Sequence, residues 1–326
     1  MMLLAIPKDL ECFFSDGVWK SVSDNSANKT AFLNSATIVK ISLFSNSAGP
    51  KQESEFNKML DNIDHQMQFS KNIQEGSVIW ICFIEERHLS LFLKNLNLLT
   101  SFDYLTWPKG CASILNSAPK LIVFDMDSTF IQIEVIDELA KAHNVGAEVS
   151  EVTESAMRGE LDFSESLITR VACLKGLSSN TIKTIANSLS LSPGVDKLVK
   201  WAHLQDIKIA IVSGGFTPFV KKLATKMNLY KVKANDLEIE ENKLTGKVLG
   251  DIVDAKAKAD FINELKQQLN LQTNEIMSIG DGANDLLMMK ETGFSLAYRA
   301  KPAVDKKAGG RMKTTNLDRL ISVFTN

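Results

Sequence analysis

The chain has 326 residues, of which 44% are hydrophobic and 23% are charged. This composition is typical of a globular protein with ample material for a core, and the length favours two domains. The 37 basic and 39 acidic residues give a net charge of −2, so bulk charge offers no case for binding nucleic acid or an anionic membrane.

The four cysteines lie far apart and include no CxxC pair. This spacing argues against a zinc site or a disulfide framework and favours a reducing compartment. Residues 1–6 are apolar, but the segment is short and lacks the basic start of a signal peptide. No apolar run is long enough to cross a bilayer. We therefore expect a cytoplasmic protein with no membrane partner.

Residues 1–117 predict a small α+β domain. Segments 36–44 and 77–84 are strand-like, and apolar residues recur at helical spacing in segments 56–67 and 89–99. The resulting β-α-β-α order fits a split βαβ sandwich.

Segment 107–119 contains two prolines and a glycine, and it predicts a linker between domains. Segment 121–124 follows with the sequence LIVF, which is typical of a strand buried on both faces. This strand ends at Asp125 and Asp127. Because ligands lie at the carboxyl ends of strands in open α/β sheets, we expect both acids to face one site. One aspartate there can attack phosphorus, and the other can move a proton.

Two further strand-like runs also end in polar residues. Segment 209–212 runs into the sequence SGG at 213–215, and segment 276–279 runs into GDGAND at 280–285. A polar turn explains one such ending as well as a site does, but three in one chain favour a common edge. Segment 294–298 is expected to be the last core strand.

Residues 134–190 contain no convincing strand, and Phe163, Leu167, Val171 and Leu174 share one helix face. We expect an all-helical cap that closes over the site and excludes water. Segment 231–250 predicts a hairpin that turns at 240–243. The basic segment 306–313 is expected to be a solvated surface.

These motifs resemble those of the haloacid dehalogenase superfamily: DxDxT at 125–129, SGG at 213–215, a lysine near 258 and GDGxND at 280–285. The segments DMDSTFIQIEVID, AMRGELDFSESLITR and GDGANDL are similar, more closely, to the bacterial-type phosphoserine phosphatase family. The resemblance covers residues 119–310 approximately.

The resemblance implies an α/β fold with a Rossmann-like parallel sheet core (118–132 and 191–326) and an inserted helical cap (133–190). The small α+β domain at 1–117 would precede this phosphatase domain (118–326). By analogy with the family, the small domain would resemble an amino-acid-binding regulatory domain. The resemblance also allows a homodimer, although no residue pattern marks the interface.

The resemblance further implies a Mg²⁺-dependent phosphoric monoester hydrolase that converts O-phosphoserine, its small-molecule substrate, to serine and phosphate in the last step of serine biosynthesis. Asp125 would be the nucleophile, and Asp127 the general acid and then the general base. Asp125, Asp281 and the backbone carbonyl of Asp127 would bind Mg²⁺. Asp285 is expected behind these ligands, where it would act through water or orient Lys258.

The residues that the resemblance assigns to the substrate are Glu134, Met157, Phe163, Arg170, Ser213, Gly214, Lys258 and Asn284. Glu134 suits an ammonium group, and Arg170 suits a carboxylate through a bidentate fork. Taken alone, these two residues fit an exposed helix salt bridge better than a substrate site.

Weaker alternatives at the substrate positions are Arg158 and Glu138, and Lys256 is the alternative to Lys258. Two other functions remain open. One is a phosphatase or phosphotransferase for another small phosphorylated metabolite, and the other is a non-catalytic amino-acid sensor.

Overall fold

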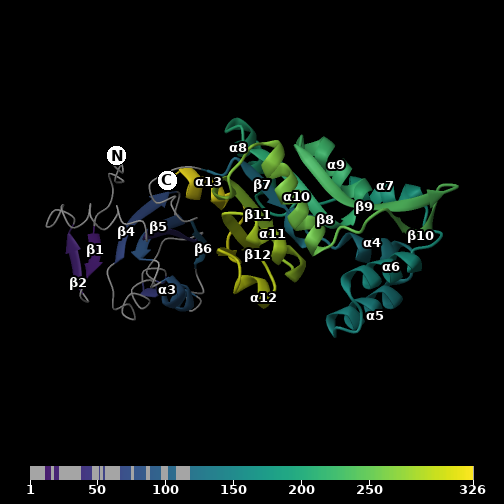
Figure 1. Ribbon diagram of the computed structural model, residues 1–326, viewed down its shortest axis with the longest axis horizontal. Coiled ribbons are helices and arrows are strands. Elements are labelled where there is room, and N and C mark those ends of the chain that lie inside the picture. Colours follow the sequence, from purple (N-terminus) through teal and green to yellow (C-terminus); the bar gives the residue numbers. More distant parts are fainter. Residues whose placement is uncertain are drawn as a thin grey trace.

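The structure is a computed structural model that describes residues 12–15, 18–21, 38–45, 51, 54–55, 67–74, 77–85, 89–96, 102–107 and 118–325. Its strands form one 13-stranded sheet in the order β10-β9-β8-β7-β11-β12-β13-β6-β3-β5-β4-β1-β2 (Figure 1). None of the helices in these residues combines the length and apolar character needed to cross a membrane.

The middle of the sheet is parallel and forms the expected Rossmann-like core. β7 (Leu121–Phe124) lies between β8 (Lys208–Phe216) and β11 (Ile276–Gly280), and β12 (Phe294–Tyr298) pairs with β11. Every residue of β7 and β11 is buried, as the apolar sequences of these strands predict. Because the strands are parallel, the carboxyl ends of β7, β8 and β11 meet at one edge of the sheet.

Helices cover both faces of this core (Figure 1). Asp254 is the N-cap of α10 (Ala255–Gln268), and its side chain accepts a hydrogen bond from the backbone N–H of Ala257. The apolar residues Phe261 and Ile262 of α10 pack against β7 and β8 in one buried cluster. The other core helices are α8 (Val195–Leu204), α9 (Thr217–Met227), α11 (Leu286–Lys290), α12 (Pro302–Asp305) and α13 (Arg319–Thr325).

The predicted hairpin is confirmed as β9 (Lys231–Glu240) and β10 (Lys243–Leu249). Glu241 and Asn242 both have positive φ angles, of 48° and 64°, as a tight two-residue hairpin turn requires. The outer edge of β10 is also paired, because Gly176 and Leu177 exchange backbone hydrogen bonds with Leu244.

Residues 133–190 form α4 (Val135–Ala142), α5 (Gly146–Met157), α6 (Phe163–Cys173) and α7 (Ser179–Asn187), as the all-helical pattern predicts. α6 begins with a capping box, in which the side chains of Asp162 and Glu165 each bind the other's backbone N–H. The helix buries Leu167 and Val171, so the predicted apolar face is the packed face.

The N-terminal strands are β1 (Cys12–Ser15), β2 (Val18–Ser21), β3 (Ile38–Ser45), β4 (Met67–Gln74), β5 (Ser77–Glu85) and β6 (Asp103–Thr106), with α3 (Leu89–Leu96) between β5 and β6. The antiparallel order β6-β3-β5-β4 is that of a split βαβ sandwich. The simpler β-α-β-α expectation was wrong in lacking β4 and β6. Met67, Phe69 and Ile73 of β4 recur at the spacing of a strand, but the expectation counted Met67 in the preceding helix. The helix expected at 56–67 lies outside the described residues, except that Met67 begins β4.

The two parts of the sheet join where β6 pairs with β13 (Gly310–Met312). β12 is therefore not the last core strand, and segment 306–313 is not simply a solvated surface, since all three residues of β13 are buried. This three-residue strand begins at the second residue of a glycine pair, so its apolar pattern is too short to be predicted. Asp103 reinforces the junction, because its carboxylate accepts hydrogen bonds from the backbone N–H groups of Lys313, Thr314 and Thr315.

Trp107 lies at the start of the predicted linker, but its side chain is only 2% exposed. Its ring packs edge-on against Phe294 of β12 and Phe324 of α13, and its Nε1 donates to Ser42 Oγ at 2.9 Å. The residue therefore ties β3 to the core, while residues 108–117 lie outside the described part of the chain.

Candidate active site

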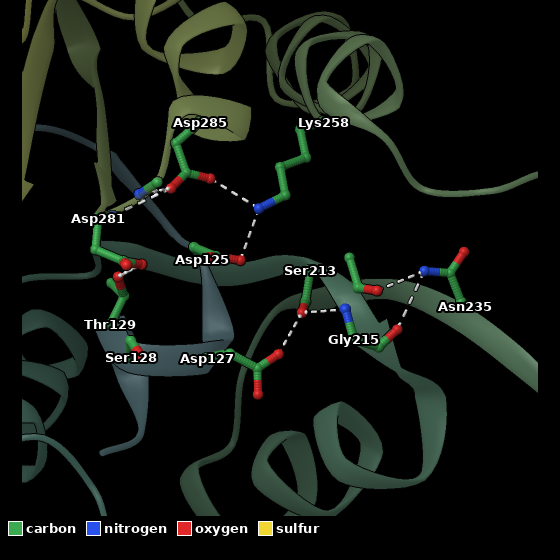
Figure 2. Close-up of polar contacts among 12 residues, drawn as sticks. Asp125, Asp127, Ser128, Thr129, Ser213, Gly215, Asn235, Lys258, Asp281 and Asp285 are labelled. Atoms are coloured by element: carbon green, nitrogen blue, oxygen red, sulfur yellow. Dashed lines mark hydrogen bonds and ion pairs between the residues drawn. The ribbon is translucent and has the colours of Figure 1, made fainter. Parts of the chain in front are cut away.

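The two acids that follow β7 both lie at the carboxyl edge of the sheet (Figure 2). Beyond Asp125 the chain turns through Met126–Phe130, where Asp127 is extended (φ −66°, ψ 138°) and Ser128 is left-handed (φ 54°). This local irregularity interrupts the alternation of a strand. It lets acids two residues apart reach different partners at the same site.

Lys258, from α10, is completely buried and lies between two carboxylates. Its Nζ donates to Asp125 Oδ1 and to Asp285 Oδ1, each at 2.7 Å (Figure 2). Burial by itself lowers the pKa of Lys258, but Asp125 and Asp285 more than offset this, so the pKa lies above its usual value. The alternative residue, Lys256, is exposed and pairs with Asp260 on its own helix.

Asp285 also orders the loop that follows β11. Its Oδ2 accepts hydrogen bonds from the backbone N–H groups of Asp281 (3.1 Å) and Gly282 (3.0 Å). A side chain at Gly280 would collide with the Asp285 carboxylate, so the close approach requires glycine there. Thr129 Oγ1 donates to Asp281 Oδ1 at 3.0 Å and joins this loop to the turn after β7.

Asp125, Asp281 and Asp285 form a group of carboxylates whose oxygen atoms lie within 4.8 Å of one another. Burial, followed by the charge of Asp285, raises the pKa of Asp281 to about 6 and the pKa of Asp125 well above its usual value. Lys258 alone does not balance this negative charge, so the oxygen-rich cluster suits a hard divalent cation such as Mg²⁺. The predicted ligands were Asp125, Asp281 and the backbone carbonyl of Asp127, without Asp285. This choice stays a prediction.

Asp127 lies between the cap and β8. Its Oδ1 accepts from the backbone N–H of Val135 at 3.0 Å, and its Oδ2 accepts from Ser213 Oγ at 3.3 Å. Burial, with a further contribution from the charge of Glu134, raises the pKa of Asp127 to about 7. A carboxyl group with such a pKa can both donate and accept a proton near neutral pH.

A pocket of about 120 Å³ opens between the cap and the sheet edge. Of the predicted site residues, it is lined by Asp125, Asp127, Glu134, Phe163, Arg170, Ser213, Gly214 and Asn284. Lys258 and Asp281 are not part of this lining, and the side chain of Met157 lies outside the described residues.

The pocket also contains residues that were not predicted, namely Ile136, Leu167, Gly215 and Phe216. Leu167 could have been found, because it shares the helix face of Phe163. The cap closes tightly on the loop after β8, since a Cβ atom at Gly214 would lie 2.7 Å from Phe163 Cζ.

Glu134 and Arg170 both reach the pocket from the cap. Glu134 is exposed and accepts a hydrogen bond from Ser128 Oγ at 2.6 Å. Arg170 is half-buried, and its Nε donates to the backbone carbonyl of Ser166. Among the described residues no carboxylate lies within ion-pair distance of Arg170, so the salt-bridge explanation finds no partner for it. Burial lowers the pKa of Arg170, and Asp137 and Glu134 oppose the shift.

The alternative cap residues lie in ordinary surface pairs. Arg158 pairs with Glu160 at 2.7 Å, and Glu138 pairs with Lys141 at 2.6 Å. Neither Arg158 nor Glu138 lines the pocket.

A parallel sheet with acids after β7, a polar loop after β8 and a helical cap is the architecture of one class of hydrolases. Residues 119–293 match the family model of the haloacid dehalogenase-like hydrolases, and the chain belongs to this family.

Within that family, the curated relatives that it matches include phosphoserine phosphatases. The chain is 45% identical over 197 residues to the phosphoserine phosphatase of Idiomarina loihiensis, a match that covers 60% of this chain and 90% of that protein. It is also 45% identical to the phosphoserine phosphatase of Vibrio cholerae, over 64% of this chain but only 63% of the relative.

A solved structure extends the similarity to the N-terminal strands. The unliganded structure of a probable phosphoserine phosphatase from Vibrio cholerae has a TM-score of 0.70 and 35% sequence identity. The similarity covers 87% of this chain and 86% of that one.

Proposed function

We propose that the chain hydrolyses O-phosphoserine to serine and phosphate through an aspartyl phosphate on Asp125. The observation that carries this proposal is the arrangement around one pocket. Asp125 and Asp127 lie at its sheet side, and Glu134 and Arg170 lie at its cap side. The relatives named above are phosphoserine phosphatases, and this supports the choice of substrate.

The proposed nucleophile is Asp125. Its Oδ1 accepts from Lys258, and its other oxygen is free to attack the phosphorus atom in line with the serine oxygen. The new bond joins this oxygen to phosphorus as the bond from phosphorus to the serine oxygen breaks. Ser213 and the backbone at Gly214 border the position of the phosphoryl group.

Asp127 is the proposed proton carrier. In its protonated form it donates to the departing serine oxygen and becomes a carboxylate. That carboxylate then takes a proton from the water that attacks the aspartyl phosphate, which releases phosphate and restores Asp125. The raised pKa of Asp127, about 7, supports both roles.

The proposed cofactor is Mg²⁺, held by Asp125 and Asp281 with the backbone carbonyl of Asp127, and with Asp285 either as a direct ligand or behind them. When bound, the ion would offset the negative charge of the phosphate and the surrounding carboxylates. Lys258 and the backbone N–H groups that bind Asp285 hold these side chains in place.

Substrate selection is proposed to lie in the cap. Glu134, oriented by Ser128, would accept the ammonium group of phosphoserine, and the guanidinium group of Arg170, which forms no ion pair with the described residues, would bind the carboxylate. Phe163 and Leu167 would pack beside the short carbon chain. Met157 and Asn284 keep their expected roles as predictions.

The domain division is proposed as 1–117 for the small α+β domain and 118–326 for the phosphatase domain with its cap at 133–190. β6 and Trp107 lie at the junction between the two domains, because they pair with and pack against the core. The cytoplasmic location and the homodimer stay predictions from the cysteine pattern and the family.

A turnover assay tests the proposed function. Purified protein is incubated with O-phosphoserine and a panel of sugar phosphates, nucleotides and phosphoethanolamine, with and without Mg²⁺ and a chelator. We expect release of phosphate from phosphoserine that requires Mg²⁺ and is abolished in Asp125→Asn. A preference for another phosphate ester would contradict the substrate, and full activity of Asp125→Asn would contradict the mechanism.

A further inference from the structure

Asn235 is a buried amide in β9 that does not line the pocket, and its side chain is 1% exposed. Its Nδ2 donates to the carbonyl oxygens of Gly214 (2.8 Å) and Gly215 (3.2 Å), and its Oδ1 accepts from the backbone N–H of Val253 (2.8 Å). Figure 2 shows the amide on the side of the loop away from Asp127. Three hydrogen bonds from one side chain thus join two loops that are far apart in the sequence.

The bond to Gly214 determines the direction of the next N–H group. A trans peptide unit is planar, so the carbonyl of Gly214 and the N–H of Gly215 point in opposite directions. With the carbonyl held by Asn235, the N–H of Gly215 points to Ser213 Oγ, to which it donates at 2.8 Å. Because the hydroxyl oxygen accepts this bond, its hydrogen must point to a different group, and the hydroxyl donates to Asp127 Oδ2 at 3.3 Å. The amide thereby orients a hydroxyl that it does not contact.

The bond to Val253 acts on the second loop. Val253 lies just before Asp254, the residue that caps α10, and α10 carries Lys258. The same amide therefore holds the chain on both sides of the site, at the polar loop after β8 and at the start of the helix that carries the lysine.

We propose that Asn235 is a positioning residue that orients the loop Ser213–Gly215 for the phosphoryl group. It also fixes the position of this loop relative to Lys258. This inference uses one part of the proposed function, namely that the loop borders a phosphoryl group. It predicts that Asn235 affects binding of the phosphate part of a ligand and leaves the binding of the amino-acid part unchanged.

The test uses the full chain with Mg²⁺ and two probes, inorganic phosphate and serine, whose affinities are measured by calorimetry. Asn235→Asp keeps the shape and the acceptor for Val253 but places an oxygen against two carbonyl oxygens. Asn235→Ser is a smaller polar substitution that serves if the first variant does not fold. We expect the affinity for phosphate and the kcat/KM for phosphoserine to fall about tenfold or more in both variants, with the affinity for serine unchanged.

Asp103→Asn is the matched control, because it is also a shape-conserving change at a buried hydrogen-bonding residue, but at the β6–β13 junction. All variants are compared at temperatures equally far below their own Tm. The inference would be overturned if the Asn235 variants bound phosphate as tightly as Asp103→Asn does. It would also be overturned if their affinities for phosphate and for serine fell by the same factor. If the wild-type chain does not hydrolyse phosphoserine, the proposed function fails, while the phosphate measurement still decides the role of Asn235.

Discussion

Lys258 Nζ lies 2.7 Å from Asp125 Oδ1, and the two side chains are 0% and 8% exposed. A buried charge without a partner of opposite charge destabilises a protein strongly. The charge of Lys258 and that of Asp125 therefore each offset the cost of burying the other. The pair couples the strand that carries the proposed nucleophile to a helix more than a hundred residues away. Removal of either partner should therefore affect both the reaction and the fold.

Lys258→Met tests this coupling. Loss of the ammonium leaves Asp125 and Asp285 as buried, unpaired carboxylates, so we expect the free energy of unfolding to fall by about 3–5 kcal/mol. Phosphatase activity should also be lost, since the Lys258 ammonium then no longer holds the Asp125 carboxylate in place. Denaturant unfolding and a turnover assay measure the two effects.

Lys256→Met, two residues away, is the control for this prediction. Lys256 is exposed and pairs with Asp260 one helical turn on, so we expect a free energy of unfolding close to that of the wild type and normal turnover. Equal effects of the two substitutions would show that the buried pair has no special role.

The stability of the metal-free protein should depend on pH through Asp127 and Asp281. Their pKa values are about 7 and about 6 when folded, against 3.8 normally, so the folded chain binds more protons than the unfolded chain between these limits. Stability therefore falls as pH rises through this window. Thermal unfolding in the presence of a chelator should show Tm decreasing from pH 5 to 7.5, and less so in Asp127→Asn.

Added Mg²⁺ should counteract the decrease of Tm with rising pH. Binding of a divalent cation requires ionised carboxylates and releases their protons, so the increase in Tm caused by Mg²⁺ should be larger at pH 7.5 than at pH 5.5. An increase that is the same at both pH values would argue against a cation site among these acids.

Arg170 should determine the preference for a carboxylate on the substrate. Arg170→Ala removes the fork that is proposed to bind that group, so we expect kcat/KM for phosphoserine to fall about 10- to 100-fold. Activity on phosphoethanolamine, which lacks the carboxylate, should change little. The ratio of the two specificity constants is the measurement.

Arg158→Ala is the matched control for Arg170, because both arginines lie in the cap and Arg158 pairs with Glu160 at the surface. We expect the ratio of specificity constants to stay at its wild-type value in this variant. A fall in both activities of Arg170→Ala by the same factor would point to a general defect of the cap.

Gly215→Ala tests the close contact between the loop after β8 and Asp127. A Cβ atom at this position would lie 2.5 Å from Asp127 Oδ2, so the carboxylate must move and lose its bond to Ser213. We expect kcat to fall about tenfold or more. Gly146→Ala is the control, since nothing lies within 4 Å of its added methyl group and activity should be unchanged. Full activity of Gly215→Ala would show that Asp127 does not need this position.

Much of the core was predictable, because its signals are local. β7 is four consecutive apolar residues that end in acids, and the cap is a run of helical periodicity without strands. β13 was missed because a three-residue strand is too short to show a pattern. β4 was missed because Met67, which alternates with Phe69 and Ile73 as in a strand, was counted in a helix. Pairing with neighbours from distant parts of the chain makes them strands.

The sequence by itself determined the parallel core, the helical insertion and the acids at the strand ends, because hydrophobic periodicity and motif spacing are properties of neighbouring residues. Only the tertiary structure decided that Lys258 and not Lys256 lies beside Asp125, and that no carboxylate among the described residues lies within ion-pair distance of Arg170. It also decided that Asn235 joins two distant loops. These are relations of burial and direction between residues far apart in the chain, and they exist only after the sheet has brought its strands together.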